Sequence, residues 1–236
     1  MKFRTLLLAA AASTLFTSAA FAADEAPAEP AKPYTLSFNF GAATDYVFRG
    51  ISQTDEKGQG FAGADLAVSK FYAGTWVSNV SFAAFGDTKT NVEVDFYGGF
   101  KPTIGGLNLD IGGIYYAYLN NPAHTEYGEI YGKGSYAFGP LTLGAAVYWS
   151  PEFPAQSGDA WYYEGNAAYT VGKWTVSGAL GHQQIQKAAD YTTWNAGVSY
   201  AIKDGISIDV RYYDTNAHDF ADIYGSRGVA ALKATF

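Results

Sequence analysis

Three histidines are the first residues to consider for catalysis, because the chain has no cysteine to act as a nucleophile or a thiolate ligand. His124, His182 and His218 are far apart in the sequence, and only His218 has several carboxylates nearby, within residues 214–222. That segment would suit a cation or a surface hydrolase site, but a solvated loop explains it more simply. The chain has no G-x-S-x-G elbow, H-E-x-x-H motif or calcium-loop motif. We therefore predict no catalytic residue, no metal site and no cofactor, with a barrel hydrolase as a distant alternative.

A second set of candidates consists of charged residues that alternate with apolar ones. Asp45 and Arg49, four residues apart, would form a constriction whose opposed charges orient solutes, or else a salt bridge that fixes strand register. Pairing between strands is the equally simple explanation for every member of the set. The acidic pore-lining candidates are Asp45, Asp65, Glu93, Asp95, Asp110, Glu129, Glu164 and Asp209, and the basic ones are Arg49, Lys133, Arg211 and Lys233. Their net charge is negative, which favours cations.

The composition limits the class of protein that could carry these residues. Of the 236 residues, 16% are charged and 17% aromatic, and the net charge is −7. Soluble domains carry about 25% charged residues, so this chain is poor in charge. The acidic balance argues against a nucleic-acid partner, which requires a basic patch.

The N-terminus has the features of an export signal. Lys2 and Arg4 precede an apolar run, and Ala20-Phe21-Ala22 is a typical cleavage site. The run is shorter than the roughly 20 apolar residues of a transmembrane helix. We predict a cleaved signal peptide at residues 1–22, a flexible periplasmic segment at 23–33, rich in Pro and Ala, and a barrel domain at 34–236.

From residue 34 onward, apolar and polar residues alternate with period two. Leu36, Phe38 and Phe40 fall on one face of a strand, and Ser37 and Asn39 on the other. The pattern around Asp110 leaves the register open, because Asp110 shares a face with an isoleucine. Twelve strands, give or take two, are predicted at residues 34–49, 59–69, 71–84, 90–101, 107–118, 125–138, 141–150, 160–171, 174–184, 190–202, 206–215 and 225–236.

The connections between these strands are alternately long and short. Long ones are expected at 50–58, 85–89, 119–124, 151–159, 185–189 and 216–224, and short ones, which contain Gly, Pro, Asp or Lys, at 70, 102–106, 139–140, 172–173 and 203–205. Long loops at one end and tight turns at the other are typical of outer-membrane barrels. We therefore predict a closed antiparallel transmembrane barrel with both termini on the periplasmic side.

A secreted soluble β-sandwich or barrel would show the same alternation, but three features favour the membrane. About twelve strands is a large number for one packed soluble barrel. The chain ends in Phe236 on an alternating strand, which resembles the signal read by the outer-membrane assembly machinery. Aromatic residues also gather near the strand ends, where they would form interfacial girdles. The predicted girdle residues are Phe38, Tyr46, Trp76, Phe82, Tyr136, Phe138, Trp149, Trp174, Trp194 and Tyr212.

Three segments are similar to a known family. Residues 44–55 (TDYVFRGISQTD), 71–80 (FYAGTWVSNV) and 93–99 (EVDFYGG) resemble blocks of the TorF family of porin-like proteins, and the similarity extends over residues 34–236. The resemblance implies a β-barrel in the outer membrane of a Gram-negative bacterium. It implies no catalytic or ligand-binding residue.

The predicted function is passive diffusion of small hydrophilic solutes or ions, with a weak preference for cations. Twelve strands lie between the filled eight-stranded barrel and the 16-stranded porin with an aqueous channel, so we expect a narrow, partly obstructed pore. No segment is long enough for a separate plug domain. A surface-binding or structural barrel that does not conduct is the alternative. The expected partners are outer-membrane lipid, the assembly machinery and small polar solutes; the sequence leaves the solute and the oligomeric state open.

Overall fold

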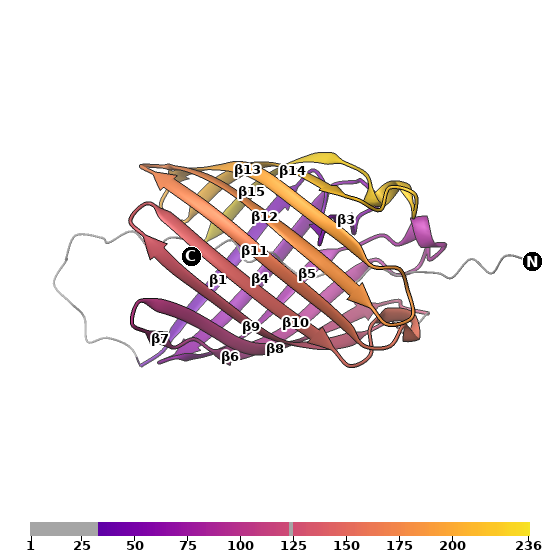
Figure 1. Cartoon of the computed structure of the whole chain (residues 1–236), viewed down its shortest axis with the longest axis horizontal. Coiled ribbons are helices and arrows are strands. Elements are labelled where there is room, and N and C mark those ends of the chain that lie inside the picture. The colour runs from indigo at the N-terminus through magenta and orange to yellow at the C-terminus, as the bar shows by residue number, and fades with distance from the viewer. Residues whose placement is uncertain (1–32, 123–124) are drawn as a thin grey trace, which may run out of the picture.

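The computed structural model describes residues 33–122 and 125–236, which form an all-β barrel (Figure 1). The predicted signal peptide and all but the last residue of the predicted tether lie outside the described residues. The strands are β1 (Thr35–Ala43), β2 (Val47–Phe48), β3 (Ile51–Ser52), β4 (Gln59–Val68), β5 (Phe71–Asn79), β6 (Val92–Phe100), β7 (Thr103–Ile104), β8 (Leu107–Leu119), β9 (Tyr127–Phe138), β10 (Leu141–Ser150), β11 (Ala160–Val171), β12 (Trp174–Ile185), β13 (Tyr191–Lys203), β14 (Ile206–Thr215) and β15 (Arg227–Thr235). Three single-turn 3-10 helices are η1 (Ala83–Phe85), η2 (Pro154–Gln156) and η3 (Asp222–Tyr224).

Twelve of the described strands close into one antiparallel barrel, which confirms the predicted fold. Each long strand pairs with its neighbours in the chain, and β1 completes the ring by pairing with both β4 and β15. The last strand is also held at its end, where Phe236 and Phe38 exchange two backbone hydrogen bonds of 2.9 Å. The short strands β2, β3 and β7 lie outside this ring of twelve.

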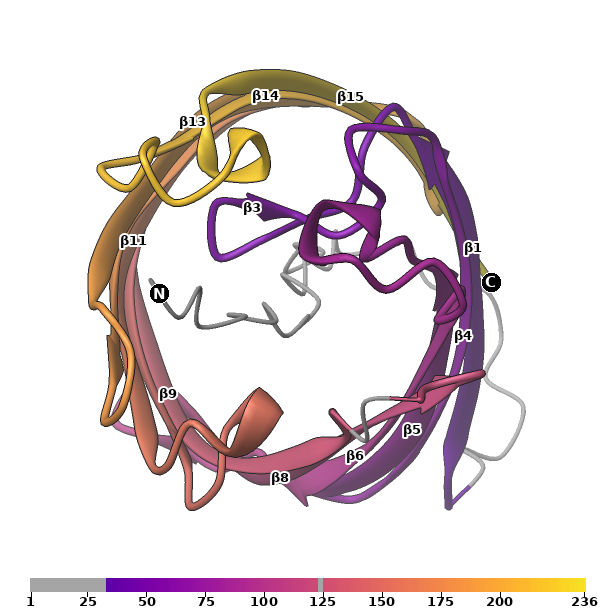
Figure 2. The same cartoon turned by 90° about the vertical axis from the view of Figure 1, so that its right-hand side faces the viewer.

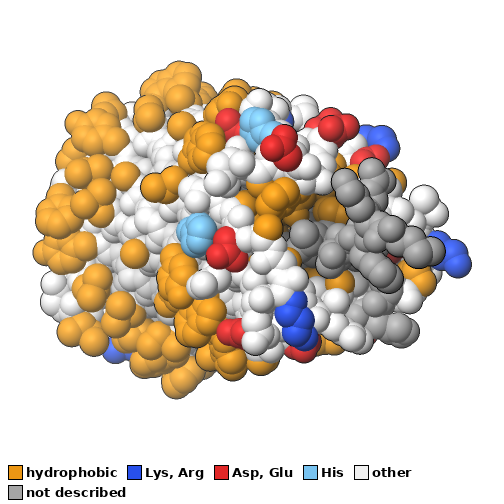
Figure 3. Space-filling model, turned by 45° about the vertical axis from the view of Figure 1, so that its right-hand side comes forward, with side chains coloured by type: hydrophobic (Ala, Val, Ile, Leu, Met, Phe, Trp, Pro, Cys, Tyr) orange, Lys and Arg blue, Asp and Glu red, His pale blue; other side chains and the backbone are white. Residues whose placement is uncertain are grey.

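The alternation separates an apolar outer face from a polar inner face. On β1, Leu36, Phe38 and Phe40 are exposed on the outside, whereas Ser37 and Asn39 are partly covered inside the barrel. An apolar outer face with polar residues inside is the arrangement of a membrane barrel. Figure 3 shows apolar side chains covering the wall, whereas acidic side chains gather toward one end.

Three predicted girdle residues face the interior instead of the exterior. Tyr46, Trp76 and Phe82 are all buried and belong to one apolar cluster inside the barrel. Trp76 is on the inner face of β5, so its aromatic type and not its parity suggested a girdle position, and the other two are in loops that fold inward beyond the strand ends. The remaining girdle residues are Phe38, Tyr136, Phe138, Trp149, Trp174, Trp194 and Tyr212, which lie on outward faces.

The register near Asp110 is regular. Strand β8 pairs without a shift with both β6 and β9, so Asp110 and Ile114 both face inward. Ile114 packs against the interior apolar cluster, which explains an isoleucine on the polar face. Among the described strands, the pairing shifts register at one place, between Ala201 and Lys203 at the end of β13.

Long loops and short turns alternate around the barrel, as the sequence predicted. The described turns are two to six residues long, and they lie at the same end as the start of β1 and the end of β15. The long loops lie at the opposite end. No helix in residues 33–122 and 125–236 is long and apolar enough to span a membrane.

The first long loop, residues 44–58, folds into the barrel instead of outward (Figure 2). It carries the hairpin β2–β3, whose residues Val47–Phe48 and Ile51–Ser52 are all buried. Its turn requires left-handed backbone at Arg49 (φ 46°) and Gly50 (φ 83°), and a Cβ at Gly50 would meet the side chain of Thr193 in the wall. The predicted strand 34–49 therefore ends at Ala43. The predicted strand 71–84 likewise ends early, at Asn79.

Candidate functional site in the barrel interior

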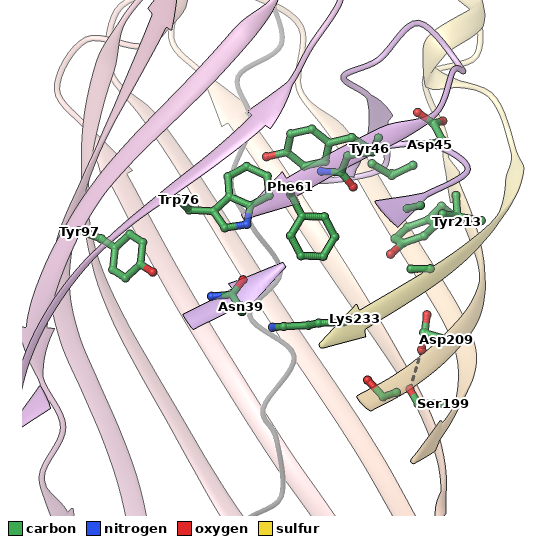
Figure 4. A pocket seen from close by; sticks show the side chains of 16 residues that line it. Asn39, Asp45, Tyr46, Phe61, Trp76, Tyr97, Ser199, Asp209, Tyr213 and Lys233 are labelled. Atoms are coloured by element: carbon green, nitrogen blue, oxygen red, sulfur yellow. Dashed lines mark hydrogen bonds between the residues drawn. The ribbon is translucent and has the colours of Figure 1, made fainter. Parts of the chain in front are cut away.

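The interior holds a cavity of about 110 Å³ beside the inward-folded hairpin (Figure 4). Aromatic side chains of the hairpin and of strands β4, β5 and β6 line one side, where Trp76 packs against Phe61 and Tyr46 at ring distances of 5.8 and 5.4 Å. Polar side chains from β1 and β13–β15 line the other side. The labelled residues around this cavity are Asn39, Asp45, Tyr46, Phe61, Trp76, Tyr97, Ser199, Asp209, Tyr213 and Lys233.

Arg49 ties the hairpin to the far wall of the barrel. Its guanidinium donates to the Glu129 carboxylate of β9 at 2.8 Å and to the Gln183 side chain of β12 at 2.7 Å. The rings of Tyr148 and Tyr162 lie within 5.0 Å of the same group, close enough for cation–π contacts. Burial disfavours the charged form, but the Glu129 carboxylate and the nearby Tyr127 and Tyr116 together raise the pKa of Arg49 above its ordinary value.

Asp45 fixes the near side of the same loop. It accepts hydrogen bonds of 2.7 Å from the hydroxyls of Ser52 and Thr54, within the loop itself. Its second oxygen pairs at 3.2 Å with Arg227 at the start of β15, and Arg227 also contacts Glu56 at 3.3 Å. Asp45 and Arg49, predicted on one strand face, thus lie on an inward loop and bind opposite sides of the barrel. They do not pair with each other.

Glu93 and Asp95 lie side by side on the inner face of β6, and both are 0% exposed. Tyr46 of the hairpin donates to one Glu93 oxygen at 2.8 Å. Burial raises the pKa of Tyr46, and the negative charge of Glu93 adds to the effect, so the hydroxyl keeps its proton. The second Glu93 oxygen and both Asp95 oxygens have no hydrogen-bond partner within the described part of the chain.

The other predicted charged residues also face inward, and several form hydrogen-bonded groups along the wall. Asp209 and Arg211 of β14 pair at 3.0 Å, and Ser199 donates to Asp209 at 2.6 Å. Asp110 of β8 lies 3.9 Å from both Lys101 and Lys133. The remaining three, Asp65 on β4, Glu164 on β11 and Lys233 on β15, also face the lumen. Asp65 accepts a hydrogen bond of 2.7 Å from Tyr97, and Glu164 accepts one of 3.0 Å from Tyr162.

Sequence reasoning missed the tyrosines that bind these carboxylates. Tyr72 donates to Asp110 at 2.6 Å, Tyr97 to Asp65, and Tyr116 to Glu129 at 3.2 Å. Each of these tyrosines is on the polar face of its predicted strand, at an even spacing from polar residues. That inward phase was the available signal, but only charged residues were predicted to line the pore.

The histidine loop contains a close pair but no assembled metal site. His218 Nε2 lies 2.6 Å from the Asp214 carboxylate, and its side chain is about half exposed. In residues 33–122 and 125–236, no three His, Cys, Asp or Glu side chains converge as metal ligands. His124 lies outside the described residues, and His182 is exposed on the outer face of β12.

Comparisons with known proteins agree with the barrel geometry. A family model described as "Bacterial protein of unknown function (Gcw_chp)" matches residues 27–236. The structure is similar to the KdgM porin (TM-score 0.59, 12% identity), over 85% of this chain and 99% of that one. A KdgM porin "in complex with disordered oligogalacturonate" gives the same values. The NanC porin matches with a TM-score of 0.55 and 10% identity, over 86% of this chain and 99% of that one.

These comparisons establish the family and the fold of the chain, but they do not test the resemblance to the TorF family. No curated protein sequence matches the chain, and the resemblance to the TorF family stays a prediction. At these identities, the structural matches establish the fold alone. The chain belongs to the Gcw_chp family of bacterial proteins, and its twelve-stranded barrel has the fold of outer-membrane porins.

Proposed function

We propose that this protein is a narrow outer-membrane channel through which small hydrophilic solutes or ions diffuse passively, with a weak preference for cations. The observation that carries the proposal is the closed barrel with an apolar exterior and a polar, charged interior. A soluble barrel has no reason to keep Phe71, Leu180 and Phe96 exposed on its outer face, where each is at least half accessible.

The inward hairpin makes this a restricted channel. Residues 44–58 occupy part of the lumen and are held to both sides of it by Arg49 and Asp45. Solutes would pass beside the hairpin, through the space of which the cavity next to Trp76 and Lys233 is a part. The geometry therefore favours ions and small molecules over polymers.

The balance of interior charge argues against an acidic solute. One KdgM structure contains oligogalacturonate, which is acidic. Along the inner face and the hairpin, the eight predicted acidic residues outnumber six basic ones, which are the four predicted residues together with Lys101 and Arg227. A barrel with that balance would repel an acidic oligosaccharide, so we expect cations and neutral solutes to pass more readily.

The test is single-channel recording after refolding into a planar bilayer. A channel gives discrete conductance steps with a reversal potential on the cation side in a salt gradient. The absence of steps from a correctly folded, heat-modifiable barrel would leave the alternative, a surface-binding or structural barrel that does not conduct. That alternative is favoured by one observation, the tight anchoring of the hairpin at both ends.

We also propose that Phe236 is read by the outer-membrane assembly machinery. Phe236 ends the last strand, its ring stacks 5.7 Å from that of Phe40, and its backbone completes the pairing with β1. Deletion of Phe236 should lower the amount of folded barrel in the outer membrane. An unchanged amount of heat-modifiable protein would argue against this role.

A further inference from the structure

Charged side chains are sorted between the two ends of the barrel. The six long loops, at 44–58, 80–91, 120–126, 151–159, 186–190 and 216–226, carry ten acidic residues and four Lys or Arg. The five short turns and the strand ends beside them carry four lysines and one acidic side chain, Asp204. The loop end is therefore acidic and the turn end basic, an asymmetry that a passive channel does not require.

The turn lysines lie next to the lipid-facing belt. Lys70 directly precedes Phe71, Lys173 directly precedes Trp174, and Lys203 follows an exposed isoleucine. These apolar neighbours are outward and open, with Phe71 62% and Trp174 56% exposed. Aromatic side chains of such belts sit at the level of the lipid headgroups, and lysines beside them reach outward to the same level.

Lys101 has a different environment and is left out of the set. Its Nζ lies 4.0 Å from the ring centre of Tyr72 and 3.9 Å from the Asp110 carboxylate, so it points toward the mouth of the lumen. In contrast, Lys173 donates to the carbonyl of Ile202 at 3.0 Å, which keeps it beside the neighbouring turn and Lys203.

The positions around the ring indicate what kind of partner would fit. Lys70 lies between β4 and β5, whereas Lys173, in the turn before β12, and Lys203, at the end of β13, lie on the other side of the barrel. A single compact protein would have to span the whole barrel mouth to contact all three. Lipid surrounds the barrel on every side and therefore meets all three lysines without any such span.

We propose that Lys70, Lys173 and Lys203 bind the phosphate groups of anionic glycerophospholipids in the leaflet around the turn end. The turn end has positive charge, exposed lysines and an adjoining aromatic belt, whereas the loop end has an excess of negative charge. A lysine near an anionic lipid surface contributes about 1 kcal/mol, equivalent to roughly fivefold in partitioning. The contacts are exposed, so salt should weaken them.

The experiment measures which lipids border the folded barrel. The full-length mature protein is reconstituted in phosphatidylcholine bilayers that contain spin-labelled phosphatidylglycerol or spin-labelled phosphatidylcholine, and electron paramagnetic resonance gives the motionally restricted fraction of each. We expect a several-fold preference for phosphatidylglycerol at low salt that shrinks where the Debye length falls to about 3 Å, near 1 M salt.

Two triple variants test which lysines cause the preference for phosphatidylglycerol. Substitution of Lys70, Lys173 and Lys203 by Gln should remove most of it. The matched control, substitution of the exposed loop lysines Lys57, Lys89 and Lys187 by Gln, changes the net charge equally and should leave it intact. Heat-modifiable migration checks that both variants fold. The proposal would be overturned if the wild-type barrel restricted the motion of the two labelled lipids equally, or if both triple variants lost the same share of the preference for phosphatidylglycerol. Neither outcome depends on whether the barrel conducts.

Discussion

Two buried carboxylates in the barrel illustrate how environment decides the effect of the same chemical group. Glu129 is paired with Arg49 and accepts a further bond from Tyr116, whereas neither Asp95 oxygen has a partner in the described structure. Breaking a buried ion pair leaves the other charge uncompensated and costs about 3–5 kcal/mol. Removing a buried carboxylate that has no partner relieves a desolvation cost instead.

The two residues should therefore respond in opposite directions to the same change. We expect Glu129→Gln to lower the free energy of unfolding by about 3 kcal/mol or more, because it leaves the Arg49 guanidinium buried without a counter-charge. Asp95→Asn, which also replaces a carboxylate by an amide of the same shape, should leave stability unchanged or raise it. Urea unfolding in detergent or lipid, followed by tryptophan fluorescence, gives both values. A larger loss for Asp95→Asn would show that this carboxylate has an unrecognised partner.

At the scale of the strand, side chains alternate between lipid and lumen, so the odd or even position of a residue along its strand decides which side it faces. Val210 lies outward at the middle of β14, opposite Val198 on β13 and Ala230 on β15. Val210→Arg should cost about 2–4 kcal/mol if the position is near the bilayer midplane. The matched control, Asn166→Arg on the inner face of β11, adds the same side chain next to Glu164 and should cost far less. Folding yields into vesicles compare the two. Reversed severity would mean that the assignment of faces is wrong by one residue.

The hairpin β2–β3 is the element that the sequence predicted least well. Alternation continues through Tyr46 and Phe48, so period-two counting extended the first strand to Arg49. The structure ends that strand at Ala43 because the loop satisfies its polar groups within itself, through Asp45, Ser52 and Thr54. A long-range partner such as Glu129, 80 residues away from Arg49, leaves no local trace in the sequence.

Release of the hairpin should widen the channel. Arg49→Ala removes both hydrogen bonds to the far wall, those to Glu129 and Gln183, so we expect a higher and noisier single-channel conductance than in the wild type. Arg211→Ala is the control, because it removes the same kind of side chain from the wall, where Arg211 pairs with Asp209 and donates to Asn195 and Ser177. Equal conductance in wild type and Arg49→Ala would mean that the hairpin stays inside the barrel without this anchor.

At the scale of the whole molecule, closure and topology were the most predictable features. Strand number and the loop–turn alternation follow from repeated local signals, such as Gly139-Pro140 and Gly172-Lys173 between alternating segments. The interior was less predictable, because inward loops and cross-barrel contacts depend on side chains that meet only after closure. Trp76 shows the limit: its type suggested a lipid girdle, but its parity on β5 places it inside.

The predicted orientation has a direct test in intact cells. Loops 151–159 and 216–226 should lie outside the cell, and the turn at 172–173 should face the periplasm. Protease added to intact cells should therefore cut only in the long loops, and cutting at 172–173 should require a permeabilised outer membrane. Residues 45–54 should resist cleavage although they belong to a long loop, because they are buried inside the barrel. Cleavage of intact cells at 172–173 would reverse the orientation.

Cation preference is also a property of the whole molecule, because it depends on the summed field of the fixed charges. Fields in a narrow channel with a low-dielectric wall are focused, so carboxylates that are partly open to the lumen, such as Asp65 and Asp110, should attract cations. Asp65→Asn with Asp110→Asn should therefore move the reversal potential in a salt gradient toward zero, whereas Arg49→Gln should increase the preference. Substituting Gln for Glu93 and Asn for Asp95 together should have a smaller effect, because both side chains are fully buried and three of their four oxygens have no partner in the described structure, which disfavours the charged form. All these shifts should fade with salt, because the Debye length falls from about 10 Å at 0.1 M to about 3 Å at 1 M. Selection for anions, or shifts that do not depend on salt, would contradict this electrostatic origin.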